Sequence, residues 1–79
     1  MIRQQMQQLF RSVFGNPELV LHDHTTAADV QNWDSLAHVK LIVVVEKHFG
    51  VRFKNLEVAR LKTVGDLVQL VAKYRPDLN

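Results

Sequence analysis

The sequence predicts an all-α fold: a small four-helix bundle of three main helices and one short helix, with a long first loop. Apolar residues recur at helical spacing near both ends of the 79-residue chain. A more apolar segment between them is bounded by residues that start and stop helices. No segment offers a partner strand for a sheet. Because a chain of this length makes one small domain, we assign residues 1–79 to a single unit.

The first helix is predicted from an apolar stripe on one side. Its members fall on a single helical face: Ile2, Met6, Leu9, Phe10, Val13 and Phe14. The run Gly15-Asn16-Pro17 ends this helix, because glycine readily takes the left-handed conformation found past helix ends. Residues 18–33 form a long connection, and such loops are usually functional or partly structured. We expect four of its side chains to point inward: Leu19, Leu21, Val30 and Trp33.

The second helix is predicted over residues 35–48. Asp34 is a suitable N-cap, Lys47 and His48 place positive charge in the last turn, and Gly50 closes the helix. The run Leu41-Ile42-Val43-Val44-Val45 is mostly β-branched and is also compatible with a short buried strand. The cap residues at both ends favour a helix. Since the run is apolar around most of a helix, we expect this helix to be nearly central.

The remaining segments predict one short and one longer helix. Residues 51–53 form an extended link, and residues 55–60 form one or two helical turns with Leu56 and Val58 packed inward. Thr63 caps the last helix, with Asp66 three residues later in a capping-box arrangement. Pro76 prevents its continuation. The predicted buried stripe of this helix consists of Val64, Leu67, Val68, Val71 and Ala72.

The composition limits the function. A core this thin cannot easily enclose a deep cleft, so we expect a protein that is not an enzyme. The chain has no cysteine, which excludes disulfides and zinc-thiolate sites. Residues 1–5 lack the pattern of a secretory signal, and no apolar run is long enough to span a membrane. We expect a cytoplasmic monomer. The loop histidines His22 and His24 lack further metal ligands at suitable spacing, so no metal site is expected.

Ser35 is the candidate functional residue because it follows Asp34 at the start of an apolar helix. Helix N-termini present unpaired backbone N–H groups and partial positive charge, which suit a phosphate group. A hydroxyl here is also a plain capping group, since Ser and Asp are preferred at this position in any protein. His38 stands one turn later. Asp34 is poorly placed to orient the far side of that imidazole, so a hydrolytic triad is not expected.

The segment Asp34-Ser35-Leu36, with Val39, Ile42, Val43, Glu46, Phe49, Gly50 and Val51, resembles the attachment site and second helix of the acyl carrier protein family. Residues 61–67 resemble the start of that family's last helix. The resemblance implies that a transferase attaches 4'-phosphopantetheine to Ser35, and that Asp34 helps to hold the metal and phosphate during transfer. Leu36 would lie near the arm. The arm would carry acyl chains as thioesters and present them to enzymes of fatty acid, lipid or polyketide-type biosynthesis.

The charge departs from the family's acidic pattern. The chain has a net charge of +2, and residues 34–62 carry +3, with acids interspersed among the bases, so we expect no nucleic-acid partner. We expect partner enzymes to contact Trp33, Lys40, Glu46 and Lys47, with Trp33 also pinning the loop to the bundle. The sign favours dedicated partner enzymes. The valine-rich helix is equally compatible with cargo binding and with ordinary core. A peptidyl or aminoacyl carrier and an unmodified helical interaction module remain alternatives.

Overall fold

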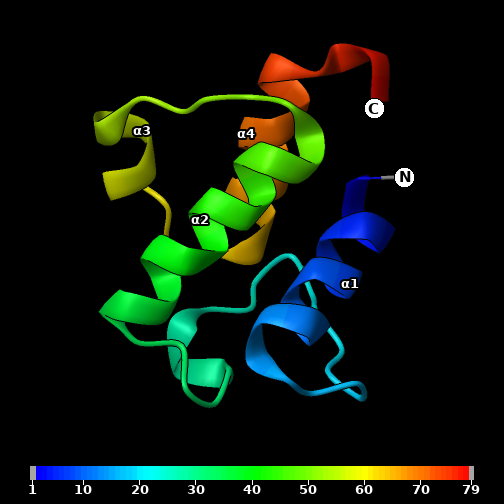
Figure 1. Ribbon diagram of the computed structural model, residues 1–79, viewed down its shortest axis with the longest axis vertical. Helices are drawn as coiled ribbons and strands as arrows, with labels where there is room; N and C mark the ends of the chain where they lie inside the picture. The colour runs from blue at the N-terminus through cyan, green and yellow to red at the C-terminus, as the bar shows by residue number, and fades with distance from the viewer. Residues whose placement is uncertain (1, 79) are drawn as a thin grey trace.

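The computed structural model describes residues 2–78 and confirms the predicted all-α fold. Its helices are α1 (Ile2–Phe14), α2 (Ser35–Phe49), α3 (Asn55–Ala59) and α4 (Val64–Tyr74), with 3₁₀ turns η1 (Ala27–Asp29) and η2 (Pro76–Leu78) (Figure 1). Within the described residues the only extended pairing is an isolated bridge between Thr26 and Thr63. No helix in this part of the chain is both long and apolar enough to cross a membrane.

The core lies where α1, α2 and α4 meet. Phe10 and Met6 of α1 are fully buried, as are Leu41, Val45 and Phe49 of α2 and Val71 of α4. The predicted stripes are confirmed, although Leu9, Val13, Phe14 and Ala72 lie at the edge of the core and are half-buried. One side of each of these three helices is therefore fixed by burial of apolar surface.

The two ends of α2 follow the sequence prediction closely. Asp34 Oδ1 accepts a hydrogen bond from Ala37 N at 2.8 Å, which makes Asp34 the N-cap. Gly50 closes the helix in the left-handed conformation, with φ of 67°, as predicted, and the last helical residue is Phe49, one after the predicted end. Glycine has no Cβ to clash in that conformation, so it is the natural residue here.

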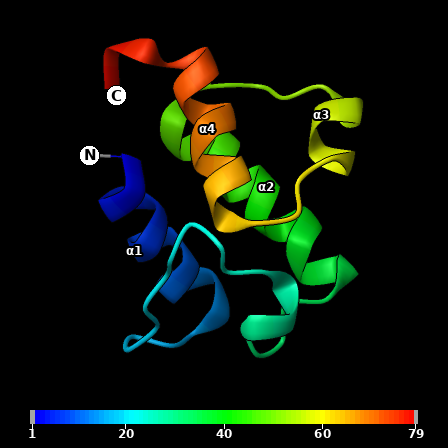
Figure 2. The ribbon, with the colours of Figure 1, turned by 180° about the vertical axis from the view of Figure 1, so that it is seen from behind.

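The expectation that α2 is nearly central is wrong. α1 and α4 pack on one side of it, as Figure 2 shows from behind, and among residues 2–78 no element covers the side that faces the viewer in Figure 1. Leu36, Val39 and Val43, spaced three and four residues apart, share one face of α2, and 82%, 62% and 43% of their surface is exposed. We call this face the open side of α2. α2 buries only one side, through Leu41, Ile42, Val45 and Phe49, so its other apolar residues stay in contact with solvent.

The predicted inward packing of α3 is half wrong. Val58 packs against the core, but Leu56 is 63% exposed. Successive residues turn by about 100° around a helix, so residues two apart face nearly opposite ways. A single turn can therefore bury only one of these two side chains.

The long first loop is tied down along its whole length. Val30 is buried and Leu19, Leu21 and Trp33 are half-buried against the core, as predicted. Backbone hydrogen bonds of 2.8 Å join Val64 N to Thr25 O and Gly65 N to Asp23 O, so the loop is fixed to the start of α4. Arg3 of α1 adds an ion pair with Asp23 at 2.9 Å. This loop forms part of the wall around the start of α2.

Candidate functional site at the start of helix α2

Ser35 is the first residue of α2 and is exposed. The chain reaches it through Asn32, whose φ is 71°, and Asp34 N donates to Asn32 O at 3.0 Å. Asparagine tolerates this left-handed conformation better than most residues, so the chain makes this turn without a glycine. The turn presents the Ser35 hydroxyl at the positive end of a 15-residue helix.

Trp33 pins this turn to the bundle. Its ring meets Phe10 edge-on at a centroid distance of 5.2 Å and lies 5.9 Å from Phe14. It stacks on His38 at 6.0 Å, and its Nε1 donates to His38 Nδ1 at 3.1 Å. The predicted pinning role is confirmed. Because Trp33 is only half-buried, part of its ring also remains accessible beside Ser35.

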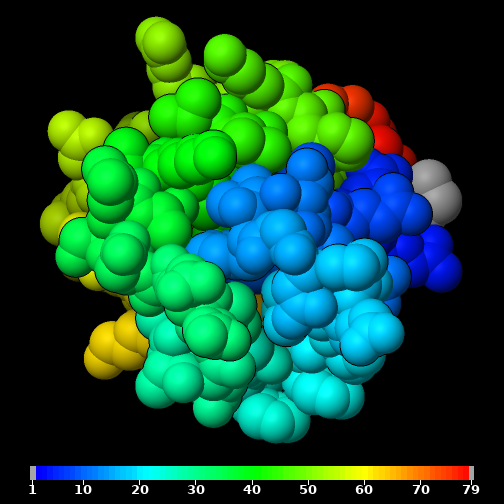
Figure 3. All heavy atoms as spheres, turned by 60° about the horizontal axis from the view of Figure 1, so that its bottom comes forward, coloured from blue at the N-terminus to red at the C-terminus, as the bar shows by residue number. Residues whose placement is uncertain are grey.

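An open groove of about 410 Å³ runs beside the serine, lined by Ala27, Trp33, Asp34, Ser35, His38 and Leu61. A narrower cavity of about 70 Å³ shares Ala27, Trp33, His38 and Leu61 and continues past them to Lys62, Thr63 and Leu67. Figure 3 views this end of the molecule, where the loop before α2 and the start of α2 form one continuous surface. The groove walls therefore come from three separate segments of the chain.

The structure does not form a hydrolytic triad at Ser35. His38 Nδ1 accepts from the Trp33 indole, whereas a triad histidine donates from one nitrogen to a carboxylate. The Asp34 carboxylate instead caps α2 through Ala37 N. Partial burial lowers the pKa of His38 below its usual value of 6.5, which favours the neutral imidazole.

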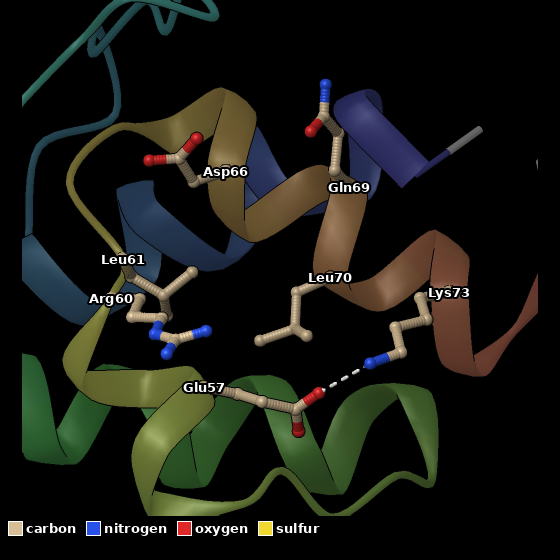
Figure 4. A pocket seen from close by; sticks show the side chains of 7 residues that line it. All are labelled: Glu57, Arg60, Leu61, Asp66, Gln69, Leu70 and Lys73. Atoms are coloured by element: carbon tan, nitrogen blue, oxygen red, sulfur yellow. Dashed lines mark hydrogen bonds and ion pairs between the residues drawn. The ribbon is translucent and has the colours of Figure 1, made fainter.

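A second open pocket of about 420 Å³ lies between α3 and α4 and shares Leu61 with the groove (Figure 4). Glu57 accepts from Lys73 at 2.9 Å and also from the Tyr74 hydroxyl. These bonds, with Lys73 foremost, then Tyr74 and the Lys54 backbone, lower the pKa of Glu57 from 4.5 to about 2. This network ties the short helix to α4.

The residues predicted to contact partners do not all behave alike. Lys40 and Lys47 are exposed on α2. Glu46 is half-buried, and its Oε2 accepts from Phe53 N at 2.8 Å, so one of its oxygens stabilises the link after α2. Leu36 is the most exposed large apolar side chain of the open side of α2.

His38 and Leu61 are the site residues whose importance the sequence did not reveal. The sequence raised His38 only as a triad member, and Leu61 only within the segment 61–67. The spacing of Trp33 and His38 offered a signal, since an indole N–H placed five residues before an imidazole can reach it across the first turn of a helix. Leu61 gave no local signal, because its place at the groove depends on how α3 and α4 pack.

The comparisons with known proteins agree with this geometry. The family described as "Phosphopantetheine attachment site" matches residues 4–71. An acyl carrier protein of Acidothermus cellulolyticus is 37% identical over 65 residues, covering 82% of this chain and 77% of that protein. One of Thermosynechococcus vestitus is 39% identical over 56 residues, covering 71% of this chain and 68% of its own.

A solved structure shows the same fold. The solution NMR structure of a holo acyl carrier protein from Geobacter metallireducens superposes with a TM-score of 0.88 at 40% sequence identity. The match covers 98% of this chain and 90% of that one. The prosthetic group that this family implies is a covalently attached phosphopantetheine, and an exposed serine beside an open groove suits it. The chain belongs to the acyl carrier protein family.

Proposed function

We propose that Ser35 is the attachment residue for 4'-phosphopantetheine and that the chain carries acyl groups for partner enzymes. The observation that carries the proposal is the exposed Ser35 hydroxyl at the start of α2, beside a groove of about 410 Å³. The thiol of the attached group supplies the thioester chemistry that a chain without cysteine lacks. The chain itself contributes the tether, the groove and the surface that partners recognise.

The surroundings of Ser35 support a role in which another protein does the chemistry. A serine without an adjacent base is a weak nucleophile, and His38 Nδ1 is occupied by Trp33. A phosphopantetheinyl transferase would therefore have to remove the Ser35 proton. The Asp34 carboxylate keeps one oxygen on Ala37 N, and we assign the other to the transferase-bound metal. Leu36 lies next to Ser35 on the open side of α2 and would contact the transferase or the arm.

The test is intact mass after incubation with coenzyme A, magnesium and a broad-specificity phosphopantetheinyl transferase. We expect the wild-type chain to gain the mass of one phosphopantetheine and Ser35→Ala to gain none. Ser12→Ala is the matched control, since Ser12 is the chain's other serine and is exposed on α1. A gain that survives in Ser35→Ala, or no gain in a folded wild-type chain, would contradict the proposal.

Partner choice is proposed to follow from α2. Its open side combines apolar Leu36, Val39 and Val43 with the exposed cations Lys40 and Lys47, and Trp33 and Glu46 lie at its two ends. Complementary charge speeds encounters and disfavours wrong partners. We therefore assign this carrier to dedicated enzymes of a specialised lipid or polyketide-type route, with carboxylates around their docking surface.

Charge reversal tests that assignment. For a general acyl-transferring enzyme of fatty acid synthesis, we expect Lys40→Glu to raise kcat/KM for acyl loading by about tenfold at low salt and much less at high salt. The control is Gln4→Glu/Gln8→Glu, which makes the same change in net charge at two exposed positions of α1. If the general enzyme loads the wild-type chain efficiently and Lys40→Glu leaves kcat/KM unchanged, the assignment to dedicated enzymes is contradicted. Loading with an amino acid by an adenylating enzyme would instead support a peptidyl carrier.

A further inference from the structure

The hydrogen bond between Trp33 and His38 fixes which imidazole nitrogen carries the proton. An indole Nε1–H only donates, so its partner His38 Nδ1, at 3.1 Å, must be the unprotonated nitrogen. In the neutral ring the proton then sits on Nε2. Partial burial, which lowers the pKa of His38, favours the same neutral form. His38 thus has one defined donor, Nε2–H.

His38 lies on the same side of α2 as Ser35. Residues three apart on a helix are neighbours on one face, with about 5–6 Å between their Cβ atoms. Helical side chains also lean toward the N-terminus, which brings His38 over the turn that begins at Ser35. Both residues line the same groove. Among residues 2–78, Nε2 makes no hydrogen bond, so its proton is available to a group in the groove.

The charges around Ser35 create a need for such a donor. A phosphodiester on Ser35 would carry a negative charge next to Asp34, whose carboxylate is also negative. The start of α2 offsets part of this repulsion through its positive end. The narrower cavity next to the groove is lined by both His38 and the cation Lys62. A neutral imidazole N–H can donate to a phosphate oxygen without giving up its bond to Trp33.

We propose that His38 Nε2–H donates to a phosphodiester oxygen of the arm on Ser35, with Trp33 as the positioning residue that holds the donor tautomer. The inference rests on the proposed function, because it needs the arm on Ser35. In this arrangement the His38 imidazole binds the arm, so the part of the arm nearest Ser35 lies along the groove between Trp33 and Leu61. The distal part and its thiol remain outside this contact.

The experiment compares apo and holo protein by NMR, after intact mass has shown the arm in place. Long-range ¹H–¹⁵N spectra should show His38 as the Nε2–H tautomer in both forms, with its Nε2 resonance shifted in the holo form. His48 is the internal control, because it lies at the other end of α2 and bonds to Gln5. Its resonances should not shift.

Variants separate binding from packing. In holo His38→Gln, whose amide nitrogen replaces Nε2, the ³¹P resonance of the arm should stay near its wild-type position. In holo His38→Leu it should move to that of a phosphopantetheinylated serine peptide. Trp33→Phe keeps the aromatic packing but removes the donor, so His38 should then exchange between tautomers.

The outcomes distinguish a failure of the proposed function from a failure of this inference alone. No mass gain overturns the proposed function and this inference with it. A mass gain with an unmoved His38 resonance, or a ³¹P resonance identical in wild type and His38→Leu, overturns the inference alone. A shifted His38 resonance together with rescue by Gln supports it.

Discussion

Phe10→Ala is expected to lower the free energy of unfolding by about 3–5 kcal/mol, the usual cost of removing a buried phenylalanine. Phe10 is completely buried and touches Phe14 and Trp33 through ring contacts of 5.8 Å and 5.2 Å. At the usual 0.05–0.15 kcal/mol per residue, a chain of this length has about 4–12 kcal/mol in total. The loss is therefore between about a quarter of the total stability and all of it, so the unfolding midpoint should fall far below that of the wild type.

Urea unfolding followed by far-ultraviolet circular dichroism measures this loss. Trp33 fluorescence is less suitable, because it would also respond to the local change beside the Trp33 ring. Phe14→Ala is the matched control: the same atoms are removed from a half-buried ring, so we expect a clearly smaller loss. Equal losses for the two variants would show that burial at Phe10 is not the source of the effect.

Gly65→Ala is expected to destabilise the protein by about 1–3 kcal/mol, although alanine is the better helix former by about 1 kcal/mol. A Cβ at Gly65 would lie 2.8 Å from the Asp23 carbonyl oxygen and 3.1 Å from Asp23 Cβ. The oxygen belongs to the backbone and cannot rotate away. The loop must shift, which breaks the bond from Gly65 N and adds an overpacking cost of about 1–3 kcal/mol.

Thermal unfolding of Gly65→Ala beside Gln69→Ala tests this balance. Gln69 is exposed on α4, so its replacement reports the effect of alanine on this helix without the contact to Asp23. We expect Gln69→Ala to leave the midpoint nearly unchanged and Gly65→Ala to lower it by several degrees, in line with about 4–8 °C per kcal/mol for small domains. An unchanged or raised midpoint for Gly65→Ala would refute the steric argument.

The local rules of the sequence predicted the helix ends well. Asp34, Gly50 and the pair Thr63 and Asp66 act on backbone groups within four residues of themselves, so their roles are visible in the sequence. The stripe of α1 was also correct, because a helix with one strongly apolar face has only one way to face a core. The candidate Ser35 followed from the same kind of local reasoning.

What the sequence could not predict depends on packing between distant segments. The valine-rich part of α2 is apolar around most of the helix in the sequence, and only the packing of α1 and α4 on one side of it reveals that Leu36, Val39 and Val43 stay exposed. Leu56 and Val58 are indistinguishable by composition. The approach of Asp23 to Gly65 joins residues 42 positions apart, and no spacing rule anticipates it.

The hydrogen bonds from α4 to the first loop have a consequence for transplanting parts of this protein. The open side of α2 lies within one continuous segment and could be moved to another carrier as a single exchange. The groove cannot be moved in this way, since Ala27, Trp33 and Leu61 reach it from separate segments. The hydrogen bond from Val64 N to Thr25 O joins the first loop to the start of α4. A chimera that exchanges α2 alone would thus receive the proposed partner surface but keep the host's surroundings for the arm.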